Sequence, residues 1–215
     1  PWPDEGGVPI ERRNRVIASI GGGINIINDA LLMMRERGIR TQCQFNLNQK
    51  NFFHGVKLWG FVPGIRREQR YRPIFLAQKI ANEVIGGDLV HTEHAGARPE
   101  FAATGYFEDS REEKLTYGDV PALWSYGFRE GARRGLILFN LDTTDAHPVQ
   151  LVFDGDAGDG ATAWWLSADS ITANNEYENG EPQVRVRQEE VADFASGHRL
   201  ELPPHSMVVL EWRDG

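Results

Sequence analysis

The chain has 215 residues, a net charge of −8 at pH 7 and 40% hydrophobic residues. This length and composition are enough to bury a core in one or two domains and are not those of a disordered chain. The acidic balance disfavours nucleic-acid phosphates, and no apolar run approaches the roughly 18 residues that would cross a bilayer. We therefore predict no nucleic-acid partner and no membrane span. The single cysteine, Cys43, excludes an internal disulfide and leaves the compartment open.

The first seven residues, PWPDEGG, are typical of a segment from within a longer protein. They include no initiator Met, no basic stretch and no apolar stretch, whereas a signal peptide needs the last two. We expect the chain to be truncated, with processing or trimming as the alternative explanation of this start.

The first half of the chain begins with a predicted helix. Apolar residues recur from Val16 to Met34 at steps of three and four, which is the spacing of one helix face. The run Gly21-Gly22-Gly23 interrupts this stripe, and each Gly costs roughly 1 kcal/mol relative to Ala in a helix. We expect a kink or break there, or close packing of the helix against a neighbour. Gly38 is expected at the C′ position that ends the helix.

A strand, a long loop and a second helix are predicted next. Residues 41–47 alternate polar and apolar side chains, as in a strand with one buried face. An aromatic-rich loop spans 48–72, and Pro73 suits the first position of a helix. Gly86-Gly87 is expected to stop that helix. Its predicted buried face consists of Phe75, Leu76, Ile80 and Val84.

From residue 88 onward the apolar period changes to two, and Gly, Asn and Pro turns separate the segments. Short strands without intervening helices indicate an antiparallel β-sandwich. The sequence thus predicts an α/β segment over 1–87 and a sandwich domain over 88–215. The expected strands are 88–93, 122–128, 135–141, 148–153, 161–166, 183–188, 198–202 and 206–212.

Several segments, in this order, resemble the C-terminal part of α-L-arabinofuranosidases and related β-xylosidases, which are clan A glycoside hydrolases. Residues 30–34 (ALLMM) are similar to the family's seventh barrel helix. Residues 41–48 are similar to strand eight, and the Arg-Pro-aromatic segment 72–77 is similar to the start of the eighth helix. The resemblance implies that 1–87 is the last helix-strand-helix of a (β/α)8 barrel.

The sandwich half carries the better agreement. Residues 135–141 (GLILFNL) resemble the family's central strand that ends in Asn. Residues 166–169 (LSAD), followed by 174–179 (NNEYEN), resemble a leucine-small-x-Asp … Asn-x-x-Glu-Asn segment. Residues 202–210 (LPPHSMVVL) resemble the terminal Leu-Pro-Pro-x-Ser strand. Other barrel-plus-sandwich hydrolases share this tail, so the sugar is not fixed.

The resemblance implies a retaining glycoside hydrolase acting on plant or algal polysaccharide. Such enzymes use two carboxylates about 5–5.5 Å apart, and the family places them at the ends of barrel strands four and seven. Both positions would lie upstream of Pro1, so we expect this chain to be inactive alone. Glu5 is an alternative nucleophile, but no apolar strand precedes it and Gly6-Gly7 marks a loop. We therefore expect Glu5 to be a solvated loop charge.

The loop 48–72 is the predicted substrate-binding segment. It would leave strand eight at the face where barrel active sites lie, and aromatic rings stack on sugars while amides contact hydroxyls. Our candidate residues are Asn48, Gln49 and Trp59. The alternative is that the aromatics cover the barrel end or the domain seam. The arginines are expected to form a solvated or salt-bridged face rather than to bind an acidic sugar; they are Arg66, Arg67, Arg70 and Arg72.

No metal or other cofactor is predicted. Asp154, Asp156 and Asp159 resemble a calcium loop, but position 165 is Trp instead of the bidentate Glu. His91, Glu93 and His94 are a second candidate metal site, but His91 and His94 would point to opposite faces of a strand.

Trp164-Trp165 would place one indole on each face of its strand, one in the core and the other at the rim or domain seam.

The expected partners are carbohydrate and either the upstream barrel portion of the same protein or a second copy of the chain. An incomplete barrel would leave an exposed strand edge and an apolar helix stripe that need cover. The alternative function is a stand-alone carbohydrate-binding or structural sandwich module without catalysis. The helix-strand-loop-helix prefix favours the hydrolase, because a binding module has no need of it.

Overall fold

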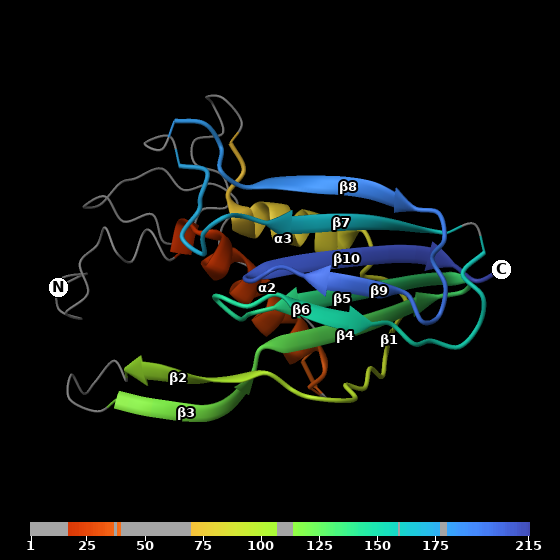
Figure 1. Ribbon diagram of the computed structural model, residues 1–215, viewed down its shortest axis with the longest axis horizontal. Helices are drawn as coiled ribbons and strands as arrows, with labels where there is room; N and C mark the ends of the chain where they lie inside the picture. Colours follow the sequence, from red (N-terminus) through yellow and green to blue (C-terminus); the bar gives the residue numbers. More distant parts are fainter. Residues whose placement is uncertain (1–16, 37, 40–69, 107–113, 159, 177–179) are drawn as a thin grey trace.

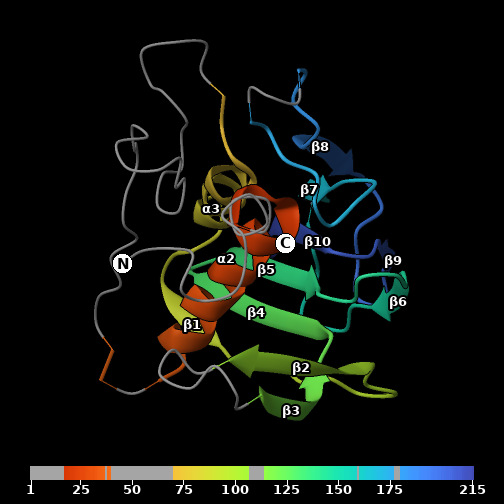
Figure 2. The ribbon, with the colours of Figure 1, turned by 90° about the vertical axis from the view of Figure 1, so that its left-hand side faces the viewer.

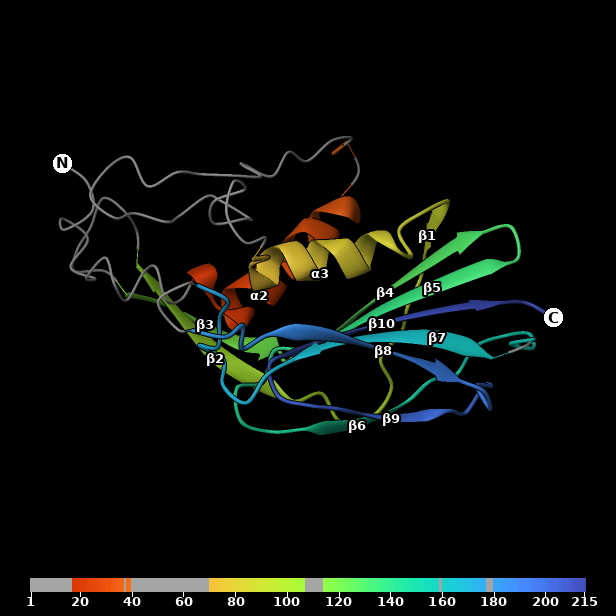
Figure 3. The same ribbon diagram turned by 90° about the horizontal axis from the view of Figure 1, so that it is seen from above.

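The structure is a computed structural model that describes residues 17–36, 38–39, 70–106, 114–158, 160–176 and 180–215. Within these ranges, two helices lie on one face of a six-stranded antiparallel sheet (Figure 1). Seen from above, a two-stranded ribbon lies on the other face (Figure 3). The helices are α2 (Ile20–Met34) and α3 (Pro73–Asn82). Neither they nor any other helix in these ranges is long and apolar enough to cross a membrane.

The large sheet has the strand order β1-β4-β5-β10-β7-β8, and every neighbouring pair is antiparallel. Its strands are β1 (Asp88–Val90), β4 (Leu123–Glu130), β5 (Arg133–Asn140), β7 (Ala161–Ser167), β8 (Arg185–Val191) and β10 (Ser206–Arg213). Two further pairs are β2 (Glu100–Tyr106) with β3 (Lys114–Pro121), and β6 (His147–Gln150) with β9 (Arg199–Leu202). The eight predicted strands are confirmed with shifted ends, whereas β2 and β3 were not predicted.

The apolar stripe of α2 is buried against the sheet, as predicted. Ile20, Ile24, Ile27 and Leu31 are at most 1% exposed. Met34 does not extend this stripe: it is the last residue of α2 and is 45% exposed.

The α2 helix ends earlier than the sequence suggested. Its last residue is Met34 and Arg35 is the C-cap, so Gly38 lies beyond the C′ position that we expected for it. Gly38 still has a positive φ of 101°, which suits a turn after the helix.

The glycines of α2 permit close packing instead of a kink. The helix is continuous from Ile20 to Met34, and the Ser19 hydroxyl caps it by accepting a bond from the Gly22 N–H (3.1 Å). A Cβ at position 23 would lie 2.6 Å from the backbone nitrogen of Ile74, at the start of α3. The two helices therefore touch at Gly23, which confirms the close-packing alternative.

The α3 helix begins at Pro73, as predicted, and two of its four predicted buried residues are confirmed, because Ile80 and Val84 are 1% and 3% exposed. Phe75 and Leu76 are only half-buried, and the Phe75 ring stacks on Tyr71 with 4.4 Å between centroids. The helix ends at Asn82, and Gly87 then turns the chain into β1 with a φ of 62°. A Cβ on Gly87 would lie 2.1 Å from a backbone oxygen of β4, so this turn requires glycine. The residues that are buried are Pro73, Ile74, Ala77, Ile80, Ala81 and Val84.

The sheet buries side chains on both faces. On the helix face, Tyr126, Ile137 and Phe139 share one core with α2 and α3. On the other face, a second core lies beneath the β6–β9 ribbon. Trp164 packs against the helix-side core and Trp165 belongs to the second core, so the two indoles lie on opposite faces as predicted.

The predicted architecture is confirmed at a coarse level: helices precede a body made mostly of antiparallel sheet. The expected barrel strand 41–47 lies outside the described residues, so the helix-strand-helix of a barrel stays a prediction. The boundary between 1–87 and 88–215 also stays a prediction.

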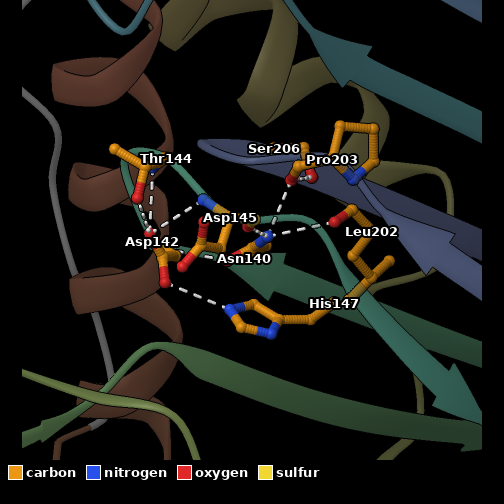
Figure 4. A network of polar contacts seen from close by, with 8 residues as sticks. All are labelled: Asn140, Asp142, Thr144, Asp145, His147, Leu202, Pro203 and Ser206. Atoms are coloured by element: carbon orange, nitrogen blue, oxygen red, sulfur yellow. Dashed lines mark hydrogen bonds and ion pairs between the residues drawn. The ribbon is translucent and has the colours of Figure 1, made fainter.

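A polar network ties the end of β5 to the turn between β9 and β10 (Figure 4). The Asn140 amide nitrogen donates to the backbone oxygens of Asp145, Leu202 and Pro203, at 2.9–3.0 Å. Its amide oxygen accepts a bond from the Asp142 N–H at 3.0 Å. Asn140 is fully buried, so these bonds replace its hydration and fix the position of both loops.

Asp142 is the charged centre of this network. One carboxylate oxygen accepts bonds from the N–H groups of Thr144 (2.9 Å) and Asp145 (3.1 Å), and the other lies 3.1 Å from His147 Nε2. The backbone N–H of Thr144 makes the largest contribution to lowering the pKa of Asp142 to about 2; the Asp145 N–H and His147 add to the effect, and burial opposes it.

Asp142 is therefore expected to make the fold sensitive to acid. Its folded pKa lies below the unfolded value near 3.8, so its contribution is complete above pH 4 and is lost as the pH falls toward 2. The expected loss is about 2 kcal/mol. Urea unfolding at pH 2, 3, 4 and 5 should show that Asp142→Asn is less stable than the wild type at pH 5 and nearly equal to it at pH 2. A stability difference that does not vary with pH would contradict this assignment.

Candidate ligand-binding groove

The predicted substrate residues Asn48, Gln49 and Trp59 lie outside the described residues, as does Glu5. Their proposed roles stay predictions. Two of the four arginines in the predicted loop, Arg70 and Arg72, are described.

Arg72 forms a buried ion pair with Glu176. Its Nε lies 2.6 Å from one carboxylate oxygen and its Nη2 lies 3.2 Å from the other, which is a bidentate pair. Arg72 is 4% exposed and Glu176 is 7% exposed. Beside them, the Asn175 amide nitrogen donates to the carbonyl oxygens of Tyr71 and Val184, both at 2.8 Å. Arg72 therefore joins the start of α3 to the loop before β8, as the salt-bridge interpretation expected.

A groove of about 650 Å³ lies over β4 and β5 on the face opposite the helices. Its floor is apolar and includes Leu123, Leu136 and Leu138, with Gly127 in the middle. Residues 90–95 form one wall and 149–154 form the other. The groove is open because neither of these two segments covers this part of β4 and β5.

A second, more polar pocket of about 480 Å³ adjoins the groove. Residues 91–94 and 123–125 line both cavities. Three further residues complete the polar pocket, namely Arg35, Arg98 and Pro121.

Arg35 is held in place by β4 and by Thr92, which follows β1. Arg35 itself directly follows α2, which lies on the same face of the sheet as α3 (Figure 2). Its guanidinium carbon lies 4.4 Å from the centroid of the Tyr126 ring. Its Nη2 donates to the Ser125 carbonyl oxygen and lies 3.4 Å from the Thr92 hydroxyl.

The Tyr126 ring beneath this arginine is itself fixed. Its hydroxyl donates to the side-chain oxygen of the buried Asn28 at 2.9 Å. Burial raises the pKa of Tyr126 to about 12, although Arg35 acts in the opposite direction. The phenol therefore stays neutral, and the ring is a rigid support for the guanidinium.

The polar pocket carries an excess of positive charge. Arg98 donates to the His94 carbonyl oxygen at 3.3 Å. Among the described residues, neither Arg35 nor Arg98 has a carboxylate within ion-pair distance. Burial, followed by the charge of Arg98, lowers the pKa of His94. Glu93, the one carboxylate among the described residues that line this pocket, lies 3.4 Å from the exposed His91.

The arrangement suits binding rather than hydrolysis. Glycoside hydrolysis needs a pair of carboxylates on either side of the scissile bond, and among the described residues Glu93 is the one carboxylate that lines the polar pocket. Two guanidinium groups, a hydroxyl and the Trp124 ring are ligand-binding groups. Within the described ranges, no cluster of three or more His, Cys, Asp or Glu side chains is arranged to hold a metal ion.

This pocket was not predicted from the sequence. His91 and His94 were expected to lie on a strand over 88–93 and were weighed there as metal ligands, but β1 ends at Val90 and both histidines follow it. The argument from opposite strand faces therefore does not apply to them. Arg35 and Arg98 are 63 positions apart and carry no local pattern, so only the fold brings them to one pocket.

Neither a protein-family model nor a curated protein matches the sequence. Solved structures are similar in fold. A crystal structure of an arabinofuranosidase has a TM-score of 0.59 and 19% identity, over 73% of this chain and 32% of that protein. The α-L-arabinofuranosidase of Thermotoga petrophila RKU-1, from glycoside hydrolase family GH51, has a TM-score of 0.59 and 18% identity, over 71% and 31% of the two chains. The α-L-arabinofuranosidase of Thermotoga maritima, in complex with arabinose, has a TM-score of 0.57, also at 18% identity and with the same coverage.

The chain therefore has a glycoside hydrolase-like fold, similar to part of these arabinofuranosidases. It spans about a third of the length of these solved structures.

Proposed function

We propose that this chain is the C-terminal part of a retaining glycoside hydrolase of the α-L-arabinofuranosidase or β-xylosidase type. The observation that carries the proposal is the fold: more than 70% of the chain superposes on arabinofuranosidases with TM-scores of 0.57–0.59. The sequence resemblance points to the same family through independent segments.

The buried Arg72–Glu176 ion pair also supports the proposal. The two segments that carry the resemblance on either side of residue 87 are 72–77 and 174–179. In the fold they meet at the Arg72–Glu176 ion pair. A contact of this kind braces the helical part on the sheet, which is the role that we propose for the sheet domain in the whole enzyme. Carbohydrate is then the substrate, and the catalytic carboxylates lie in the upstream region.

The test compares this chain with the longer protein encoded by the same gene. Both are incubated with 4-nitrophenyl α-L-arabinofuranoside and 4-nitrophenyl β-D-xyloside, and release of nitrophenol is measured. We expect turnover by the longer protein and none by the chain alone. Proton NMR of the first product should show retention of the anomeric configuration. A longer protein that cleaves neither glycoside, but binds arabinoxylan in affinity electrophoresis, would favour the alternative of a non-catalytic carbohydrate-binding module.

A further inference from the structure

We propose that the polar pocket formed by Arg35, Arg98, Thr92 and Trp124 binds the carboxylate of a uronic acid, carried on an otherwise neutral polysaccharide. The inference deepens the proposed function, because a carbohydrate ligand is expected only if the chain belongs to a carbohydrate-active protein. Nothing in the hydrolytic reaction assigns a role to this pocket.

The charge of the pocket argues for an anionic ligand. The chain has a net charge of −8, yet two guanidinium groups line one cavity of about 480 Å³ without a carboxylate partner in the described ranges. A planar guanidinium matches a carboxylate with two parallel hydrogen bonds. Arg35 is also preorganised by Tyr126 and the Ser125 carbonyl, so little side-chain freedom is lost when a ligand binds.

The surroundings of the pocket argue for a sugar carboxylate rather than a polyanion. The acidic chain repels a nucleic acid, whose phosphates are closely spaced along its length, whereas one carboxylate on a neutral chain meets little repulsion. Trp124 contributes an aromatic ring, and its indole N–H donates to the Pro121 carbonyl at 2.8 Å, which fixes the ring. The apolar groove adjoins the pocket at the shared lining residues 91–94 and 123–125 and offers space for neighbouring sugar units.

The test uses two probes that differ in one group. Methyl α-D-glucopyranosiduronate carries a carboxylate at C5, and methyl α-D-xylopyranoside carries hydrogen there. Each is titrated into the ¹⁵N-labelled chain and the amide shifts are followed by NMR. We expect saturable shifts for the uronate at residues 91–98 and 123–125. The xyloside is expected to bind at least about fivefold more weakly, because it cannot engage a guanidinium.

Variants locate the site. Arg98→Ala should weaken uronate binding about fivefold, and the fold should tolerate it because the Arg98 side chain is exposed and makes one hydrogen bond. Glu93→Gln should strengthen binding, because it removes the opposing negative charge. The control is Arg185→Ala, an exposed arginine on β8 at the far edge of the sheet. It should leave binding unchanged.

Three results would overturn the proposal: equal binding of the two glycosides, binding of inorganic sulfate as tight as that of the uronate, or no effect of Arg98→Ala. The readout involves no turnover, so its failure is separate from that of the hydrolase proposal. Loss of nitrophenol release in the longer protein would leave the uronate result intact.

Discussion

Replacing Arg72 with Met is expected to lower the free energy of unfolding by about 3–5 kcal/mol, the usual cost of breaking a buried ion pair from one side. Arg72 and Glu176 are both at least nine-tenths buried, and their two bonds join the start of α3 to the loop before β8. Methionine fills a similar volume, but it leaves the Glu176 carboxylate in a site of low dielectric without its guanidinium. Urea unfolding, followed by circular dichroism, measures the loss.

A matched control separates burial from charge. Arg185 and Glu181 also form an ion pair, but their side chains are 73% and 89% exposed. Arg185→Met should therefore cost less than about 1 kcal/mol. In a double-mutant cycle, Arg72→Met combined with Glu176→Met should cost less than the sum of the two single changes, because the double variant has no stranded charge. A cost for Arg72→Met as small as that for Arg185→Met would show that the buried pair does not brace the fold.

The elements with a clear period could be predicted from the sequence. The stripe from Ile20 to Leu31 follows helical spacing and is buried. Burial alternates in β6 and β9, whereas β5 and β10 are short apolar runs that are buried on both faces. Pro73 correctly marked the start of α3. These signals are local: each depends on residues within one or two turns or one strand, so one sequence is enough to recognise them.

Two strands escaped prediction because their composition is poor in strand formers. β2 reads EFAATGY and β3 reads KLTYGDVP, with Ala, Gly, Asp and Pro where β-branched residues are expected. They pair with each other, and that pairing stabilises them more than their propensity does. The buried face of α3 was predicted in part. Ile80 and Val84 are buried, whereas Phe75 is half-buried and packs against the helix-side core while it stacks on Tyr71.

The candidate pocket could not be predicted, because its parts are distant in sequence. Arg35 is the C-cap of α2, Arg98 lies between β1 and β2, and Trp124 is the second residue of β4. Each looks like an ordinary surface or core residue where it stands. The Arg72–Glu176 ion pair could be predicted only in part. Both segments were singled out by the family resemblance, but nothing in the sequence indicated that these two side chains meet.

Replacing Gly23 with Ala is expected to destabilise the protein by about 2 kcal/mol, although helix propensity alone predicts the opposite sign. Alanine is about 1 kcal/mol more favourable than glycine in the interior of a helix. However, a Cβ at this position would lie 2.6 Å from the Ile74 nitrogen and 2.9 Å from the Pro73 carbonyl carbon. Both are backbone atoms and cannot rotate away, so α2 and α3 must separate. Overpacking of a core costs about 1–3 kcal/mol, and Gly23→Val should cost more than Gly23→Ala.

Thermal and urea unfolding of Gly23→Ala distinguish helix propensity from overpacking by the sign of the change in the free energy of unfolding. Gly118→Ala is the control, because a Cβ at position 118 would meet no atom within 4 Å and Gly118 has no positive φ. It should be neutral or slightly stabilising, through the lower entropy of the unfolded chain. If Gly23→Ala were stabilising by about 1 kcal/mol, the helices would not be in contact at this point. The glycines would then lower the stability of α2 without being the reason that α3 can lie so close to it.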